Sequence, residues 1–270
     1  MKALKTGQSK MKFADTSDKI IPAYCVGKDS VFENSKTFDR VTKEWIKQNK
    51  FSGSFGQSVL CPTKTGDTLA VLGLGDENSR KKSRFSLAAA AKSLPAGSYE
   101  IINPESVENL EIEVLGWLIN NYVFDKYKNK KASQAYLVQP KTINCDRILK
   151  FAEAEALARN LINTPTSDMG PENLAFAVKN LANKFDAEYS EIVGENLIQQ
   201  NFPLIHAVGR ASSQEPRLLE IKNGSVGPKV TFVGKGVCFD TGGLNIKPGR
   251  SMGLMKKDMG GAANVLALTS

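Results

Sequence analysis

The stretch PKVTFVGKGVCFDTGG, residues 228–243, decides the fold class of this chain. Its apolar residues Val230, Phe232 and Val233 do not alternate strictly with polar ones, which is typical of a central strand covered on both faces. A glycine-rich loop follows at the place where open α/β sheets put their ligands, beyond the carboxyl end of a strand. The stretch therefore predicts an α/β fold with a ligand site within residues 235–243.

The residues before this stretch continue the same alternation of helices and strands. Helix patterns cover residues 144–165 and 170–185, and strand patterns cover residues 187–194 and 216–224. These elements predict an α/β domain over residues 144–270.

The first half of the chain predicts a separate domain. Strand patterns occur at residues 68–75, 98–103 and 135–140, and helix patterns lie between them at residues 83–94 and 107–127. This alternation predicts a mixed α/β domain over residues 1–143.

Charge and cysteine content narrow the class of protein. The chain of 270 residues has a formal net charge of +8, and its four cysteines form no CxxC pair. Scattered surface lysines give such a charge more often than a nucleic-acid patch does. Widely separated cysteines are typical of reduced thiols in the cytosol, and no apolar stretch approaches the roughly 18 residues that span a bilayer. We therefore expect a soluble, cytoplasmic protein without a membrane segment.

Two lysines and two aspartates carry the candidate chemistry: Lys235, Asp240, Lys247 and Asp258. Carboxylates bind divalent cations, and a lysine amine can join them if burial and the cation's field lower its pKa. A second, charged lysine could stabilise a developing oxyanion. A glycine-rich loop with surface lysines and a helix-capping Asp258 explains the same residues. Spacing alone leaves both interpretations open, but a P-loop is excluded because GxxxxGK[ST] does not occur.

The order of four short motifs favours the first interpretation. VGKG, FDTGG, NIKP and MKKDMGGAA follow one another within residues 233–263. Together they resemble the signature of the leucyl aminopeptidase family, which are dinuclear-metal exopeptidases. ARNLINTPTSDMGPENLA, residues 158–175, resembles the segment at the entry to that family's catalytic domain. The resemblance covers residues 144–270 and implies an N-terminal mixed α/β domain followed by the first part of an α/β metallo-exopeptidase catalytic domain.

The resemblance implies a role for five residues. Lys235, Asp240 and Asp258 would be metal ligands, and Asp240 would bridge two divalent ions, manganese or zinc. Lys247 would be the catalytic lysine and would bind the scissile carbonyl of the substrate, while Met255 would line the pocket for the substrate's first side chain. The substrates would be peptides that lose their N-terminal residue, and the family's homo-oligomer is a hexamer.

The chain departs from the family's pattern in one respect. The family carries a second motif, roughly NTDAEGR, which supplies further metal ligands and an arginine, and this chain ends before it. The helix pattern that starts at residue 260 also leaves the α/β domain unfinished. We expect a truncated chain that binds at most one metal ion weakly and is inactive by itself.

Two other classes of function remain open at this point. A non-catalytic DNA-binding protein would suit the charge of +8, and a fragment that joins full-length oligomers would suit the family's assembly. His206 and Cys238 could be imagined as metal ligands, but a packed histidine and a small buried thiol are commoner.

Overall fold

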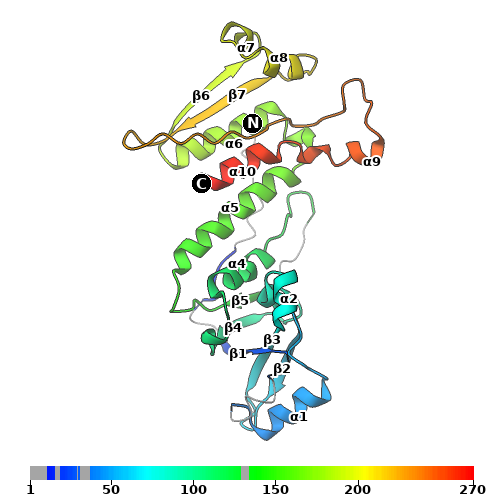
Figure 1. Cartoon of the computed structure of the whole chain (residues 1–270), viewed down its shortest axis with the longest axis vertical. Coiled ribbons are helices and arrows are strands. Elements are labelled where there is room, and N and C mark those ends of the chain that lie inside the picture. Colours follow the sequence, from blue (N-terminus) through cyan, green and yellow to red (C-terminus); the bar gives the residue numbers. More distant parts are fainter. Residues whose placement is uncertain (1–10, 16–18, 29, 31–36, 129–133) are drawn as a thin grey trace. The chain divides into compact units, whose positions relative to one another are not determined.

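The structure, a computed structural model, describes residues 11–15, 19–28, 30, 37–128 and 134–270 (Figure 1). The chain divides into two compact units, Met1–Glu153 and Ala154–Ser270. The division falls within helix α5 (Cys145–Asn163). The domain boundary that the sequence places between residues 143 and 144 stays a prediction. No helix of the described residues is long and apolar enough to cross a membrane.

The first unit is built on a five-stranded sheet of order β2-β3-β1-β4-β5. Its strands are β1 (Ile20–Gly27), β2 (Ser58–Pro62), β3 (Thr68–Gly75), β4 (Gly97–Ile101) and β5 (Ala135–Leu137). β1, β3, β4 and β5 are parallel, and the edge strand β2 is antiparallel to β3. The sheet therefore combines parallel and antiparallel strands. The unit is α/β, as the sequence predicts, and a strand is present at each of the expected positions, residues 68–75, 98–103 and 135–140.

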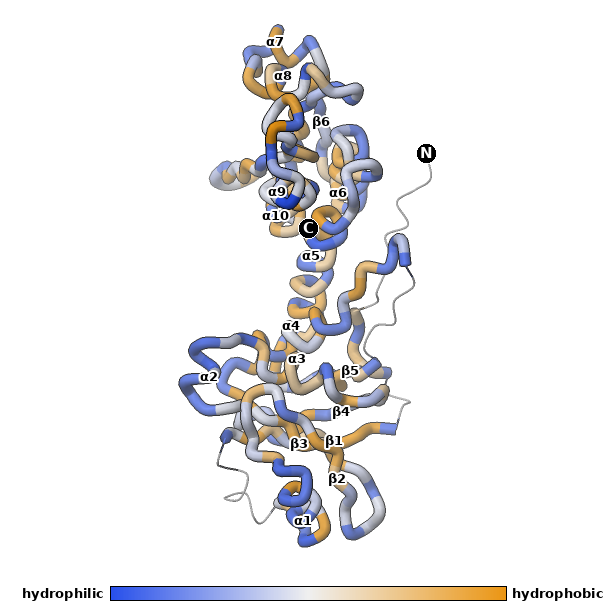
Figure 2. Tube along the Cα trace, turned by 90° about the vertical axis from the view of Figure 1, so that its right-hand side faces the viewer, coloured by the Kyte–Doolittle hydropathy of each residue, from blue (hydrophilic) through white to orange (hydrophobic). Residues whose placement is uncertain are grey.

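Helices cover this sheet on both faces. They are α1 (Arg40–Gln48), α2 (Glu77–Lys82), α3 (Ser86–Ala91) and α4 (Leu110–Asn120), with a 3₁₀ turn η1 at Pro104–Ser106. Every residue of β3 after Thr68 is buried, so neither face of this strand reaches solvent. The strands β1 and β3 are accordingly among the most apolar parts of the unit in Figure 2.

Trp117 connects α4 to the sheet by packing and by a hydrogen bond. Its ring is fully buried and packs against Tyr99 of β4, with ring centroids 6.1 Å apart. Its indole Nε1–H donates a hydrogen bond of 3.0 Å to the carbonyl oxygen of Ala135 in β5. The apolar ring and the satisfied N–H together hold helix and strand in one arrangement.

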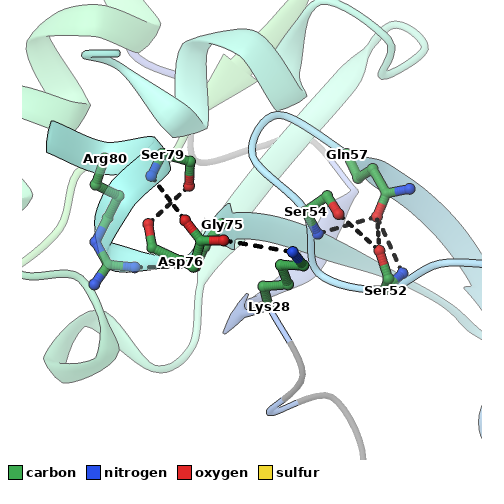
Figure 3. A network of polar contacts seen from close by, with 8 residues as sticks. All are labelled: Lys28, Ser52, Ser54, Gln57, Gly75, Asp76, Ser79 and Arg80. Carbon is green, nitrogen blue, oxygen red and sulfur yellow. Dashed lines mark hydrogen bonds and ion pairs between the residues drawn. The ribbon is translucent and has the colours of Figure 1, made fainter. Parts of the chain in front are cut away.

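Polar groups of the chain itself fill the carboxyl ends of β1 and β3 (Figure 3). Asp76 caps α2 by accepting a hydrogen bond of 2.7 Å from the backbone N–H of Ser79, and it forms an ion pair of 3.5 Å with Lys28. Arg80 donates a hydrogen bond of 3.0 Å to the carbonyl oxygen of Gly75. Parallel sheets often bind ligands at this edge, and here most of the polar groups bond to one another, while Nε of Arg80 is buried without a hydrogen-bond partner among the described residues.

The loop at residues 52–57 closes over β3 beside this network. A Cβ atom at Gly73 would lie 2.1 Å from the carbonyl oxygen of Ser54, so only glycine fits under the loop. Oε1 of Gln57 accepts hydrogen bonds from the backbone N–H groups of Ser52, at 3.0 Å, and Ser54, at 3.1 Å.

The second unit contains a two-stranded antiparallel sheet, β6 (Glu188–Val193) and β7 (Arg217–Lys222), in which Tyr189 lies opposite Ile221. Its other elements are α6 (Pro171–Lys184), α7 (Asn196–Gln199), α8 (Pro203–Gly209), α9 (Gly249–Met252) and α10 (Gly260–Leu268), with 3₁₀ turns η2 (Thr166–Asp168) and η3 (Met255–Lys257). The core of this unit lies between α5, α6 and α10 and includes Leu161, Val178 and Met259.

The strand predicted at residues 228–236 is wrong for this structure. The segment is irregular from residue 227 to residue 237 and runs between β7 and α9 in Figure 1. Val230, Phe232 and Val233, which the sequence assigns to a core, are exposed. A strand is stable only when a neighbouring strand pairs with it, and no described segment pairs with this one.

Candidate functional site

Two ion pairs join the four charged residues that the sequence singles out. Nζ of Lys235 lies 2.7 Å from Oδ1 of Asp258, and Nζ of Lys247 lies 2.7 Å from Oδ2 of Asp240. Lys235 and Asp240 belong to the irregular segment after β7, Lys247 precedes α9, and Asp258 lies between η3 and α10. Residues spread over 24 positions of sequence are therefore brought together in oppositely charged pairs.

Close backbone contact positions the first pair. The backbone N–H of Ala262 in α10 donates a hydrogen bond of 2.9 Å to the carbonyl oxygen of Lys235. A Cβ atom at Gly261 would lie 2.8 Å from the backbone nitrogen of Lys235, and one at Gly234 would lie 2.6 Å from Cα of Ala262. The two glycines thus let the segment lie directly on the start of α10, which places Lys235 beside Asp258.

A tight loop positions the second pair. Oδ1 of Asp240 accepts a hydrogen bond of 2.7 Å from the N–H of Gly242, whose φ is +78°, and the N–H of Lys247 donates one of 3.0 Å to the carbonyl oxygen of Thr241. The pKa of Asp240 is lowered, first by the hydrogen bond from the Lys247 ammonium and next by the N–H of Gly242. The more distant charge of Lys235 lowers it further, so Asp240 is an anion near neutral pH.

Met255 contacts the ion pair of Lys247 and Asp240. Its thioether sulfur is 3.2 Å from Nζ of Lys247, on the short turn η3. Lys247 is therefore held between a carboxylate and a sulfur atom, and about a third of its side chain is exposed. The role of Met255 in a substrate pocket stays a prediction.

Asp258 is not the helix cap that the alternative interpretation requires. α10 starts after Met259, and no side chain caps its first turn. Oδ1 of Asp258 binds Lys235, while Oδ2 is buried and has no hydrogen-bond partner among the described residues. A buried carboxylate oxygen without a partner is costly unless a cation or a donor reaches it.

These donors fit part of a site for a divalent cation. Asp240 and Asp258 offer carboxylate oxygens, and Lys235, which is paired with Asp258 here, could add a nitrogen ligand only as the neutral amine. The described residues contain no group of three or more histidine, cysteine, aspartate or glutamate side chains that could hold a metal ion. The side chains present thus supply some, but not all, of the ligands that such an ion takes.

Cys238 and His206 lie outside this ligand set. Cys238 is buried in the core of the second unit, and burial raises the pKa of its thiol to about 11. Nε2 of His206 in α8 lies 3.2 Å from Oε1 of Glu195.

Two supporting contacts were not predicted from the sequence. The hydroxyl of Thr166 donates a hydrogen bond of 3.1 Å to the carbonyl oxygen of Cys238, two residues before Asp240. Nζ of Lys256 donates one of 3.3 Å to the carbonyl oxygen of Asn163, at the end of α5. Both bonds tie the site to the α5–α6 connection, which the TPTSDMG stretch at residues 164–170 forms, and the unusual density of turn residues there was the available signal.

Comparison with known proteins accounts for almost the whole chain. Residues 156–270 match the family model "Cytosol aminopeptidase family, catalytic domain", and residues 21–140 match "M17 aminopeptidase, N-terminal domain". A probable cytosol aminopeptidase of Aquifex aeolicus is 31% identical over 254 residues, which are 87% of this chain and 52% of the relative. The chain thus spans about half the length of the curated relatives that it matches.

Solved structures agree. The crystal structure of cytosol aminopeptidase from Coxiella burnetii is 37% identical with a TM-score of 0.85, and the match covers 94% of this chain and 55% of that chain. The bottromycin maturation enzyme BotP, solved in complex with Mn, is 26% identical with a TM-score of 0.73, over 94% of this chain and 55% of its own.

Proposed function

Since this chain belongs to the cytosol aminopeptidase family, we propose that it contributes to the metal-dependent release of N-terminal amino acids from peptides. The observation that carries the proposal is the arrangement of Lys235, Asp240 and Asp258, which offers ligands to a cation and leaves one buried carboxylate oxygen unsatisfied. The DNA-binding alternative finds no support, because the matched relatives are aminopeptidases.

We assign Lys235, Asp240 and Asp258 as metal ligands and Lys247 as the catalytic lysine. A divalent ion bound there would polarise a peptide carbonyl and lower the pKa of a water molecule. The Lys247 ammonium, now held by Asp240 and Met255, would donate a hydrogen bond to the scissile carbonyl oxygen as that oxygen gains negative charge. Met255 lies beside Lys247, and we assign it to the wall of the pocket that would receive the substrate's first side chain.

The finer features follow from the family. We propose two divalent ions for the complete site, manganese or zinc, and the complex of BotP with Mn supports manganese. We further propose peptide substrates, a hexameric homo-oligomer and a cytoplasmic location. The part of the site described above offers two carboxylates, so we expect this chain by itself to bind one ion weakly and to need further ligands for turnover.

Calorimetric titration with Mn²⁺ tests the ligand assignment. We expect saturable binding to the chain, a loss of at least about tenfold in affinity for Asp258→Asn, and unchanged binding for Asp186→Asn, because removing one charged ligand weakens a metal site by this order or more. Asp186 is a matched control, since it is exposed and has a φ of +51° that asparagine adopts readily. Equal affinities for the two variants would contradict the assignment.

Hydrolysis of leucine p-nitroanilide in the same samples tests Lys247. Any Mn²⁺-dependent turnover should fall at least about 100-fold in Lys247→Ala, as it does when one oxyanion donor is lost. Lys257→Ala, at an exposed lysine of η3, should leave it unchanged. Turnover that survives Lys247→Ala would remove this residue from the catalytic role.

A further inference from the structure

A cavity lies in the first unit, beyond the carboxyl ends of β4 and β5. The last backbone hydrogen bond between the two strands is donated by the N–H of Val138 to the carbonyl oxygen of Tyr99, at 2.8 Å. The next donor in this register is residue 140, a proline, which has no N–H group. The ladder therefore ends there, and a cavity of about 210 Å³ opens between the diverging segments.

The lining of this cavity combines apolar surface with two opposite charges. Its apolar part comes from four residues: Ile101, Ile102, Pro104 and Val138. Glu100 of β4 lines the cavity as well, and so does Lys141, which lies between β5 and α5. An apolar cavity with a few polar groups, placed at the carboxyl ends of parallel strands, is the usual form of a small-molecule site.

The chain does not use the two charges itself. Neither Glu100 nor Lys141 forms an ion pair or a side-chain hydrogen bond with another described residue. The other end of the same sheet edge differs, because there Asp76 pairs with Lys28. An acid and a base that line one cavity without meeting leave room for a ligand that carries both an ammonium group and a carboxylate.

Size and charge together restrict the class of ligand. The cavity is smaller than the roughly 300–1,000 Å³ of sites for drug-sized molecules, so a nucleotide or a peptide of several residues would not fit inside it. A simple anion would meet the charge of Glu100, and a simple cation would meet the charge of Lys141. A free amino acid with an aliphatic side chain matches the size, both charges and the apolar wall.

We propose that this cavity binds a free aliphatic α-amino acid, with its ammonium group toward Glu100, its carboxylate toward Lys141 and its side chain against Ile101 and Val138. Such an amino acid is also a product of the hydrolysis proposed above. The idea that the first unit binds the product of the reaction rests on that proposed function, whereas the binding of the amino acid does not.

Titration of the full chain with L-leucine tests the proposal. The chain carries ¹³C-labelled isoleucine and valine methyl groups, and their NMR shifts are followed without any metal ion. We expect saturable shifts at Ile101 and Val138 with a dissociation constant of about 1 mM, because so small a ligand gains limited free energy on binding. Shifts that do not saturate would overturn the proposal, as would shifts confined to residues of the second unit such as Val178.

Two analogues of leucine test the role of each charge. 4-Methylpentanoate lacks the ammonium group, and 3-methylbutylamine lacks the carboxylate. Each should bind at least about fivefold more weakly than leucine, since each loses one charge-assisted contact at the partly exposed edge of the cavity. An analogue that binds as tightly as leucine would refute the pairing of charges on which the proposal depends.

Variants assign the two contacts to their residues. Glu100→Gln should remove the preference for leucine over 4-methylpentanoate, and Lys141→Gln should remove the preference for leucine over 3-methylbutylamine. Lys92→Gln, at an exposed lysine of the same unit, is the matched control and should keep both preferences. A Glu100→Gln or Lys141→Gln variant that melts at the temperature of the unaltered chain and keeps its preference would contradict the assignment.

The same samples distinguish this proposal from the proposed function. Saturable shifts at Ile101 and Val138 in a chain that fails to bind Mn²⁺ would support the amino-acid site and count against the aminopeptidase function. Binding of Mn²⁺ that depends on Asp258, in a chain without those shifts, would do the reverse.

Discussion

At the scale of single residues, the candidate site depends on contacts that no sequence pattern gives. The motif spacing predicts that Lys235, Asp240, Lys247 and Asp258 belong together, and the structure brings them into two pairs. Which lysine meets which aspartate could not be predicted, because it depends on how the segment lies on α10 and how the loop at residues 240–247 turns. The unsatisfied oxygen of Asp258 could not be predicted from the sequence either, because burial depends on how the chain packs.

A second aspartate allows a test of stability against pH. The carboxylate of Asp39 caps α1: it accepts hydrogen bonds of 2.8 Å from the N–H of Thr42 and of 2.8 Å from the N–H of Lys64, and these two bonds lower its pKa. A lowered pKa in the folded state stabilises the protein above the unfolded value, near 3.9, and this contribution is lost as the pH falls through the folded value.

We therefore expect Asp39→Asn to lower the melting temperature at pH 7, and the difference from the unaltered chain to shrink as the pH falls below the unfolded value, near 3.9. Circular dichroism melts at pH 7 and at a series of lower pH values measure this difference. Asp186→Asn serves as the control and should leave the melting temperature unchanged, because its side chain is exposed. A difference that stays constant from pH 7 to pH 3 would mean that the charge of Asp39 does not matter.

At the scale of elements, Trp117 makes the strongest prediction. Trp117→Phe removes the buried hydrogen bond to Ala135 and leaves a small cavity beneath α4, so it should lower the free energy of unfolding by about 1–3 kcal/mol. Trp45→Phe is the matched control. Trp45 is largely exposed on α1, so its loss should change the stability by no more than about 0.5 kcal/mol. Urea unfolding followed by far-ultraviolet circular dichroism compares them, and equal costs would show that the fastening of α4 to β5 contributes little.

The elements also show where prediction from the sequence succeeds. The strand at residues 68–75 is found at the same residues, because an apolar run ending in glycines can be buried inside a sheet whose neighbours are close in the chain. The helix predicted at residues 107–127 is shorter, Leu110–Asn120, since helix ends depend on local caps and tertiary contacts. The strand predicted at residues 228–236 does not form, although its composition favours one. Propensity belongs to the segment itself, whereas a strand requires a partner that composition does not provide.

At the scale of the whole molecule, the two units offer separate reporters. Both tryptophans, Trp45 and Trp117, lie in the first unit, and the proposed metal ligands lie in the second. A ligand that binds only the folded state stabilises it by about 2.7 kcal/mol at a concentration of 100 Kd. If the units unfold independently, this stabilisation belongs to the second unit alone.

We expect saturating Mn²⁺ to slow amide exchange in α10 and to leave the urea midpoint of tryptophan fluorescence unchanged. The chain without added metal and the Asp258→Asn variant with Mn²⁺ are the controls. A midpoint that rises with Mn²⁺ in the unaltered chain but not in the variant would show that the units unfold as one.

The glycines beneath the first ion pair have a consequence for protein engineering. At positions 234 and 261 the absence of two Cβ atoms allows the irregular segment before Lys235 to approach α10 closely enough for the hydrogen bond between Ala262 and Lys235. A library of variants at the charged residues alone would change the chemistry of the site. It would leave unchanged the two glycines that allow Lys235 to approach Asp258. We expect that grafting the four charged residues onto another scaffold would rebuild the ion pairs only if the glycines at positions 234 and 261 were grafted with them.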